Sequence, residues 1–289
     1  MNRIALLLAA SVACEASARE AAVTLAGPAM GTTYRVTLAR GLPNMSDGEI
    51  HREVEQLLER IDRAMSTWRE DSEASRFNRA PAGAWVEVSA DLIAVVRIAR
   101  QVHADSHGAF DITAAPAGSG RPVGMRHLES RDSPPALRKQ VDGLAIDLGG
   151  IGPGYAVDEI GDRLARLGSA DHLVELGGEV RAWGRRADGV NWRVRLRREA
   201  AAGRQDAMIE LADGGAIATS SVKPGRSPVD PRTGRVVAAT FSLATVRASS
   251  CAVADACAVA AVVLGIQPGP DGTIDATSQS SPFTARSWK

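Results

Sequence analysis

Aromatic side chains are scarce in this chain of 289 residues, where Phe, Trp and Tyr together make up only 4% of the sequence. The 45% of hydrophobic residues are enough for a packed core, but Ala, Val and Leu must fill it, in one large domain or two modest ones. Net charge is absent too, because 34 Lys and Arg offset 34 Asp and Glu. Charge therefore gives no indication of nucleic acid or anionic lipid as a partner, and we expect no nucleic acid.

Cysteine is also rare, with three residues in the chain. Cys251 and Cys257 are six positions apart, which is not an interval that shares a helix face, so a disulfide would need Cys251 to lie outside the helix predicted there. An oxidising compartment would permit that bond. Two small buried thiols are the other interpretation, and we favour it. The chain has no CxxC pair or Cys/His cluster that would indicate zinc.

The first 18 residues are typical of an export signal. Arg3 is followed by an apolar run over 4–13 and by the small residues 16–18, which suit a cleavage site. A second interpretation is a lipoprotein signal ending before Cys14, which would be the lipidated residue. We therefore expect a periplasmic protein, either soluble or lipid-anchored to the inner membrane. After this run, no segment is long and apolar enough to span a bilayer.

Hydrophobic spacing predicts an α+β fold with mixed or antiparallel sheets and packed helices. Helices are predicted over 50–65, after a capping box of Ser46 and Glu49, and over 91–105 and 252–264. Alternation predicts a strand pair, or one strand with a turn, over 22–39. Further strands are predicted at 172–176, 192–197, 207–211, 216–219 and 240–247. Residues 114–136 are predicted to form a loop, and the tail 266–289 to be irregular. Since strands and helices do not alternate steadily, α+β is favoured over a doubly wound sheet.

A glycine-rich segment lies at the centre of the chain. An apolar run with Leu144, Ile146 and Leu148 predicts a strand, four glycines follow within 149–154, and a helical pattern then continues to Gly168. A strand, a glycine loop and a helix in this order bring free backbone N–H groups and a helix N-terminus close to an anion. We expect a phosphate-bearing ligand at this turn.

Several short motifs follow one another in a set order. They are Pro28-Ala29-Met30-Gly31-Thr32; Ser66-Thr67-Trp68, with Ser72 and Asn78; Gly108-Ala109-Phe110-Asp111-Ile112-Thr113; the glycine loop and helix start at 147–158; Gly177-Gly178-Glu179; Ala218-Thr219-Ser220; Asp230-Pro231-Arg232-Thr233-Gly234; and Ala254-Asp255-Ala256. The ordered set resembles the ApbE-like family, the FAD:protein FMN transferases. The resemblance places one ApbE-like domain at 22–265.

The resemblance implies a specific activity. Family members are exported, bind FAD and Mg²⁺, and attach FMN through a phosphoester to Thr or Ser of a target protein, with release of AMP. The targets are typically flavin-bearing subunits of membrane electron-transfer complexes. Two alternatives stay open: a non-catalytic flavin-binding homologue, and a Mg²⁺-dependent FAD pyrophosphatase that releases FMN and AMP to water.

The resemblance also assigns site residues. The positions that match FAD contacts are Met30, Trp68 (where the family usually has tyrosine), Ala109, Phe110, Asp111, Asp147, Pro153 and Val229. Those that match magnesium ligands are the carbonyls of Gly150 and Ala258 and the carboxylate of Asp255. Hard oxygen ligands of this kind suit Mg²⁺.

Three departures from the family fall on functional positions. Pro153 replaces a lysine near the phosphates, Val259 replaces a threonine one helical turn after Asp255, and Ser227 replaces a histidine that could accept the proton of the attacking hydroxyl. We therefore assign no catalytic base, because the remaining histidines lie elsewhere in the series: His51, His103, His107, His127 and His172. The chain is also short between 113 and 144, between 220 and 230, and after 265. These changes predict weakened or altered catalysis.

Overall fold

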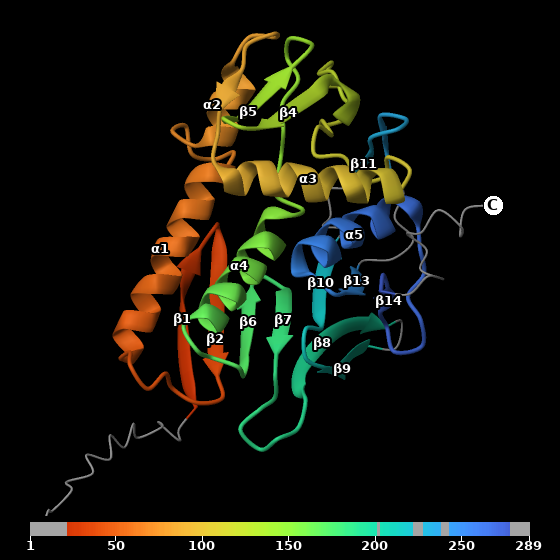
Figure 1. The fold of residues 1–289 in the computed structure, drawn as a ribbon. Coiled ribbons are helices and arrows are strands. Elements are labelled where there is room, and N and C mark those ends of the chain that lie inside the picture. The colour runs from red at the N-terminus through yellow and green to blue at the C-terminus, as the bar shows by residue number, and fades with distance from the viewer. Residues whose placement is uncertain (1–21, 201–202, 222–227, 238–242, 278–289) are drawn as a thin grey trace, which may run out of the picture.

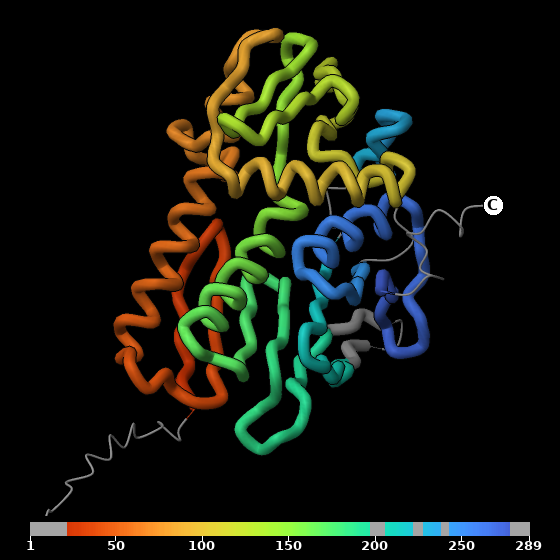
Figure 2. The backbone as a smooth tube through the Cα atoms, in the orientation of Figure 1, coloured from red at the N-terminus to blue at the C-terminus, as the bar shows by residue number. Residues whose placement is uncertain are grey.

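The computed structural model describes residues 22–200, 203–221, 228–237 and 243–277, so the predicted signal segment with Cys14 lies outside the described residues. Figures 1 and 2 show the course of the chain. The helices are α1 (Asp47–Met65), α2 (Glu73–Arg79), α3 (Ala90–Asp105), the 3₁₀ turn η1 (Met125–His127), α4 (Gly152–Arg166) and α5 (Cys251–Leu264). The strands are β1 (Val23–Ala29), β2 (Thr32–Leu38), β3 (Val86–Glu87), β4 (Leu128–Asp132), β5 (Pro135–Lys139), β6 (His172–Leu176), β7 (Glu179–Trp183), β8 (Trp192–Ala200), β9 (Gly203–Leu211), β10 (Ala216–Ser221), β11 (Val229–Asp230), β12 (Arg235–Val236), β13 (Leu243–Ala248) and β14 (Ile274–Asp275).

The main sheet has seven strands in the order β1-β2-β6-β7-β10-β13-β14. Its pairs are antiparallel except β13 with β14, which run parallel. Helices α4 and α5 pack on one face of this sheet, and α3 lies across the end of α5 (Figure 1). The β8–β9 hairpin packs elsewhere, over a second cluster that includes Val180, Trp192 and Ile217. The predicted α+β fold with mixed and antiparallel sheets is confirmed.

Helix α1 forms as its sequence predicts. The Ser46 hydroxyl accepts a hydrogen bond from the Glu49 N–H, and the Glu49 carboxylate accepts one from the Ser46 N–H, which completes the capping box. Its buried face contains the apolar residues that define the helical period. Helix α5 differs because it is buried nearly all round; it begins at Cys251, one residue earlier than predicted, and both of its cysteines are buried free thiols.

Two predicted irregular segments contain strands. The loop predicted at 114–136 contains η1, β4 and the start of β5. Strand β5 pairs with β4 on one side and β3 on the other, which forms a separate three-stranded sheet at the α2 end of the molecule (Figure 1). Only the first residue of β4, Leu128, is buried, so the sequence shows no alternation there. The tail also has structure before 278, because β14 pairs with β13 and Ile274 is buried. Among the described residues, no helix has both the length and the apolar content needed to cross a bilayer.

The strand predicted before the glycine loop is absent. Residues 144–148 have no regular secondary structure, and their three apolar side chains are buried. Side chains rather than a neighbouring strand bond much of their backbone. The Asn78 side chain donates to the Ile146 carbonyl (2.9 Å) and accepts from the Ile146 N–H (2.8 Å), and the Lys139 ammonium donates to the Leu144 carbonyl (2.9 Å). The Asn78 amide therefore provides the two backbone hydrogen bonds that a neighbouring strand would provide, and it holds the segment that leads into the glycine loop.

Candidate active site

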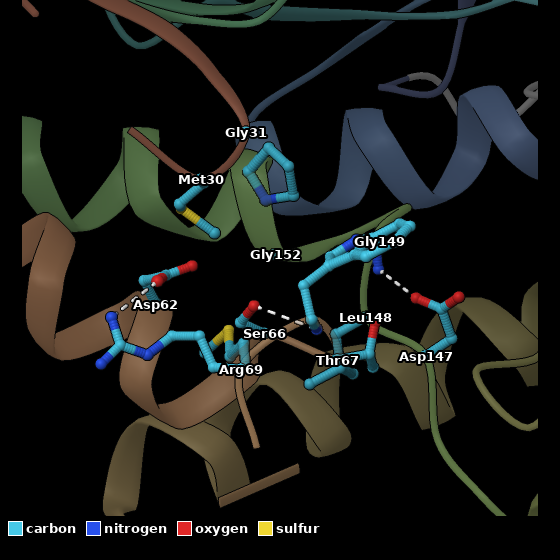
Figure 3. A pocket seen from close by; sticks show the side chains of 13 residues that line it. Met30, Gly31, Asp62, Ser66, Thr67, Arg69, Asp147, Leu148, Gly149 and Gly152 are labelled. Atoms are coloured by element: carbon cyan, nitrogen blue, oxygen red, sulfur yellow. Dashed lines mark hydrogen bonds and ion pairs between the residues drawn. The ribbon is translucent and has the colours of Figure 1, made fainter. Parts of the chain in front are cut away.

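A pocket of about 480 Å³ opens between the β1–β2 turn, the C-terminal end of α1 and the glycine loop (Figure 3). Its volume lies in the usual range of small-molecule sites. The residues that line it are Met30, Gly31, Asp62, Met65, Ser66, Thr67, Trp68, Arg69, Asp147, Leu148, Gly149, Gly152 and Pro153. The fold therefore brings together four of the predicted FAD contacts, Met30, Trp68, Asp147 and Pro153, from three separate segments.

The β1–β2 turn aims Met30 at the start of α4. Met30 has a φ of 47°, and Gly31 follows with a φ of 75°, so the chain reverses through two left-handed residues. That conformation is uncommon for a residue other than glycine and indicates a constrained turn. A Cβ placed at Gly152 would lie 3.7 Å from Met30 Cε and 3.6 Å from Met65 Sδ. The two thioethers thus form an adaptable apolar wall of the pocket.

Trp68 stands at the rim of this pocket with 91% of its surface exposed. Its backbone N–H donates to the Ser66 hydroxyl (3.3 Å), which holds the turn after α1. Because an aromatic ring stabilises a fold mainly through burial, the exposed indole of Trp68 contributes little to the stability of this fold. The ring is therefore available to stack on a planar ligand.

Charges in the pocket are largely compensated within the chain. Among the described lining residues Arg69 is the cation, and its guanidinium already faces Glu59 (3.3 Å), Asp62 (3.5 Å) and Asp71 (3.2 Å). Asp147 is exposed and accepts the Gly149 N–H (2.9 Å; Figure 3). Because Pro153 adds no charge, this part of the chain offers a diphosphate no uncompensated cation.

The glycine loop also uses most of its own N–H groups. The bonds are Gly149 N to Asp147 Oδ1, Ile151 N and Gly152 N to the Leu148 carbonyl, and Gly154 N to Asp255 Oδ2, while Pro153 has no N–H. Within the described residues, Gly150 is left as the one loop N–H with no protein acceptor. The expectation of several free loop N–H groups is therefore wrong for this conformation. Carboxylates accept two of these N–H groups, and the Leu148 carbonyl accepts two others.

The predicted carboxylate ligand, Asp255, lies where the glycine loop meets α5. Asp255 is 6% exposed and accepts the Gly154 N–H (3.2 Å). Burial, reinforced by the Glu179 carboxylate, raises the pKa of Asp255 well above its usual range. Burial also raises the pKa of Glu179 to about 7. No ion pair to either carboxylate occurs within the described ranges, so this pair of acids has the chemistry that a divalent cation satisfies.

Val259, which replaces the threonine expected from the resemblance, lies against Gly150 of the glycine loop. A Cβ placed at Gly150 would lie 2.8 Å from Val259 Cγ2 and 3.7 Å from Phe110 Cε2. Gly150 therefore lies against Val259, which is one helical turn after Asp255 on α5, and Ala258 lies between Asp255 and Val259 in the sequence. A methyl group stands where the resemblance implies an oxygen ligand. No cluster of three or more His, Cys, Asp or Glu occurs in the described part of the chain, so backbone carbonyls would have to complete a Mg²⁺ site.

The remaining predicted contacts lie outside the pocket lining. Ala109, Phe110 and Asp111 are buried, and Asp111 accepts from Thr113 N (2.7 Å), Thr113 Oγ1 (2.6 Å) and Met125 N (3.3 Å). These bonds organise the chain after α3. Their role toward FAD stays a prediction.

The Asp230–Gly234 motif lies close to the same region. Val229 is half-buried in the short β11–β12 hairpin, and a Cβ placed at Gly108 would lie 3.4 Å from Arg232 Cγ. Ser227, at the expected base position, lies outside the described residues. Sequence reasoning missed Asp62 and Arg69, which lie outside the motif series although their ion pairs are local. It also assigned no role to Glu179, which is in that series.

Comparison with known proteins decides the family. A sequence profile of the ApbE family matches residues 30–273. The chain belongs to the ApbE family. A relative from Vibrio cholerae serotype O1 called FAD:protein FMN transferase is 33% identical and aligns over 89% of this chain and 85% of its own length. One of the same name from Haemophilus influenzae is 29% identical over 91% and 86%.

Solved structures of the ApbE family share this fold. The flavin transferase ApbE from Vibrio cholerae superposes with a TM-score of 0.75 at 31% identity, covering 87% of this chain and 89% of its own. The apo form of the flavinyl transferase ApbE from Pseudomonas stutzeri gives a TM-score of 0.74 at 33% identity, covering 87% and 86%. The ApbE-like architecture predicted from the ordered motifs is thereby confirmed.

Proposed function

We propose that this chain transfers FMN from FAD to a Thr or Ser hydroxyl of a target protein and releases AMP. The single observation that carries the proposal is the pocket where Met30, Trp68, Asp147 and Pro153 meet beside the glycine loop, in a chain of the ApbE family. The exposed Trp68 ring and the Met30 and Met65 thioethers suit a flat heterocycle. The neighbouring loop would face the diphosphate.

The reaction exchanges one phosphorus–oxygen bond for another. The acceptor hydroxyl oxygen attacks the FMN-side phosphorus of FAD, the bond to the bridging oxygen breaks, and AMP leaves with that oxygen. The hydroxyl proton must pass to a base or to solvent. In the described part of the chain, Gly150 N–H is the loop donor still free to contact a phosphate oxygen. The protein's task is chiefly to align the hydroxyl and to keep the flavin ring in place.

The donor set at the loop–α5 junction supports Mg²⁺ as a cofactor. Asp255 would hold the ion with the carbonyls of Gly150 and Ala258, and Glu179 adds negative charge nearby. Such an ion neutralises phosphate charge during phosphoryl transfer. Val259 supplies no oxygen, so we expect a higher Mg²⁺ requirement than a threonine at that position would give.

A non-catalytic flavin-binding role is the second candidate. Pro153 removes a cation, Val259 removes a ligand, and Arg69 is already bound by three acids, so binding without turnover is consistent with the site.

Product chromatography separates the candidates. The purified protein is incubated with FAD, Mg²⁺ and an acceptor protein that contains a Thr/Ser flavinylation site, and AMP, free FMN and protein-bound flavin are measured. Transfer predicts AMP together with flavin on the acceptor. Free FMN with AMP would show a Mg²⁺-dependent FAD pyrophosphatase, and bound FAD that stays intact would show a non-catalytic flavin binder.

Location and partner are part of the proposal. The signal-like residues 1–18 support export to the periplasm, as a soluble protein or with a lipid on Cys14 at the inner membrane. An acceptor that is a subunit of a membrane electron-transfer complex would then be within reach. Fractionation of cells that express the wild-type chain or Cys14→Ala tests this: release of only the variant from the membrane indicates lipidation, and recovery of both in the cytoplasm contradicts export.

A further inference from the structure

The N-terminal ends of α4 and α5 cap each other. Asp255, one turn into α5, accepts the N–H of Gly154 at the start of α4 (3.2 Å). Asp158, one turn further along α4, accepts the N–H groups of Cys251 (2.9 Å) and Ala252 (3.0 Å) at the start of α5. Each helix therefore supplies the carboxylate that the other helix lacks in its first turn.

The two helices meet without any side chain between them at this point. A Cβ placed at Gly154 would lie 2.4 Å from the Cys251 carbonyl oxygen and 2.8 Å from Ala252 Cα. Gly154 and Asp158 are four residues apart and share one face of α4, as Cys251 and Asp255 do on α5. These faces of α4 and α5 therefore meet at three places: the bond from Gly154 N–H to Asp255, the close backbone contact of Gly154 with Cys251, and the bonds from the α5 N–H groups to Asp158.

Asp158 has its full complement of partners. Oδ1 accepts from Cys251 N and from Arg181 Nη1 (2.7 Å), and Oδ2 accepts from Ala252 N and from Ser250 Oγ (2.8 Å). The side chain is only 13% exposed. An ionised carboxylate has about four acceptor sites, and all four are used here. Its negative charge also opposes the positive end of the α5 dipole.

This arrangement distinguishes the two helix starts. The α5 start is closed to any external anion because Asp158 fills it. The α4 start has no side-chain cap on Ile151, and its one carboxylate, Asp255, comes from α5. The position of Asp255 relative to the glycine loop therefore depends on where the α5 start is held.

We propose that Asp158 is a positioning residue for the cation site: by fixing the first turn of α5 against α4, it holds the Asp255 carboxylate against Gly154 of the glycine loop. The inference rests on the proposed function, since it assigns Asp158 a role toward the ion that Asp255 would bind. Outer partners that orient a ligand commonly change metal affinity when removed. Here Asp158 acts by binding the first N–H groups of α5, and not through a hydrogen bond to Asp255 itself.

The test measures binding of Mn²⁺ alone, as a paramagnetic substitute for Mg²⁺, by electron paramagnetic resonance of the purified protein. Asp158→Asn keeps the size of the side chain but places an N–H₂ group against donors. It should weaken Mn²⁺ binding about tenfold, the low end for loss of an outer partner. FAD affinity measured without metal should stay that of the wild type, because the pocket lining does not include this residue.

A matched control uses the same helix. Arg163→Met removes an ion pair of α4 with Glu53 on α1 (2.7 Å), away from the crossing, and should leave Mn²⁺ binding unchanged. If Asp158→Asn is not recovered folded, Ser250→Ala removes one of the four donors, together with the α5 cap that accepts the Val253 N–H (3.4 Å). It should weaken Mn²⁺ binding by about threefold, less than loss of the whole partner.

The outcomes separate the two proposals. Weaker Mn²⁺ binding in Asp158→Asn, with unchanged FAD affinity and an unchanged Arg163→Met control, supports the inference. A lowered melting temperature with wild-type Mn²⁺ affinity would make Asp158 merely structural and overturn it, while the proposed function stands. Absence of saturable Mn²⁺ and FAD binding in the wild type overturns both.

Discussion

Gly154→Ala is the sharpest test of how the site is built. The added Cβ would lie 2.4 Å from Cys251 O, 2.7 Å from Cys251 C and 2.8 Å from Ala252 Cα. All three atoms belong to the backbone of α5, so no side chain can rotate away. The helices must separate, and the bond from Gly154 N to Asp255 must lengthen.

The expected loss follows from two opposing terms. Overpacking in a well-packed interior costs about 1–3 kcal/mol, and the backbone contacts at Gly154 place this case at the upper end. Alanine is favoured over glycine inside a helix by about 1 kcal/mol, which offsets part of the cost. We therefore expect a net decrease of about 2 kcal/mol in the free energy of unfolding.

Urea denaturation at equilibrium measures this change. Gly48→Ala is the matched control, because Gly48 lies in the first turn of α1 with nothing within 4 Å of an added Cβ. The control should gain about 0.5–1 kcal/mol, as expected when alanine replaces glycine in a helix. If Gly154→Ala were as stable as the wild type while the control behaved as expected, the close contact of α4 with α5 would be refuted.

Three further predictions test separate parts of the structure. Burial lowers the pKa of His172 from 6.5 to about 4. The contribution of this neutral imidazole to the free energy of unfolding is therefore complete above pH 6.5. About 3 kcal/mol of it is lost as the pH falls to 4, because the imidazole of the unfolded chain takes up a proton in this range. Thermal unfolding across this range checks it, and His172→Gln should flatten the profile. Val259→Thr adds a hydroxyl beside Gly150 and should lower the Mg²⁺ concentration needed for half-maximal transfer; an unchanged requirement contradicts the site. Trp68→Ala should weaken FAD binding about three- to tenfold through lost ring stacking, with no loss of stability, whereas Met208→Ala, which is 59% exposed on β9, should bind FAD as the wild type does.

Local patterns in the sequence were sufficient for the elements that depend on near neighbours. The capping box at Ser46 and Glu49 and the apolar stripe after it predict α1, because both signals lie within the helix itself. The same holds for α3, for β6 and for the glycine that ends α4. Four of the eight residues that the ordered motifs assign to FAD, namely Met30, Trp68, Asp147 and Pro153, line one pocket, whereas the other four lie outside its lining.

Features that depend on distant partners could not be predicted. Gly154 and Asp255 are separated by 101 positions, and nothing near either residue indicates that they touch. Residues 144–148 have the composition of a strand, but their partner is the side chain of Asn78, 68 positions from Ile146. The loop N–H of Gly154 was counted as free for the same reason, because its acceptor is the distant Asp255 carboxylate. The N–H groups of Gly149, Ile151 and Gly152 are instead bonded locally, to Asp147 and to the Leu148 carbonyl.

Transfer to a protein hydroxyl is tested most directly by counting products from one reaction. The purified protein, FAD, Mg²⁺ and an acceptor with a Thr/Ser flavinylation site are combined, and AMP is quantified alongside the intact mass of the acceptor. The account predicts AMP and FMN-bearing acceptor in equal amounts, both lost when that Thr or Ser is replaced by alanine. AMP without any gain in acceptor mass, or neither product under conditions where FAD is bound, would contradict it.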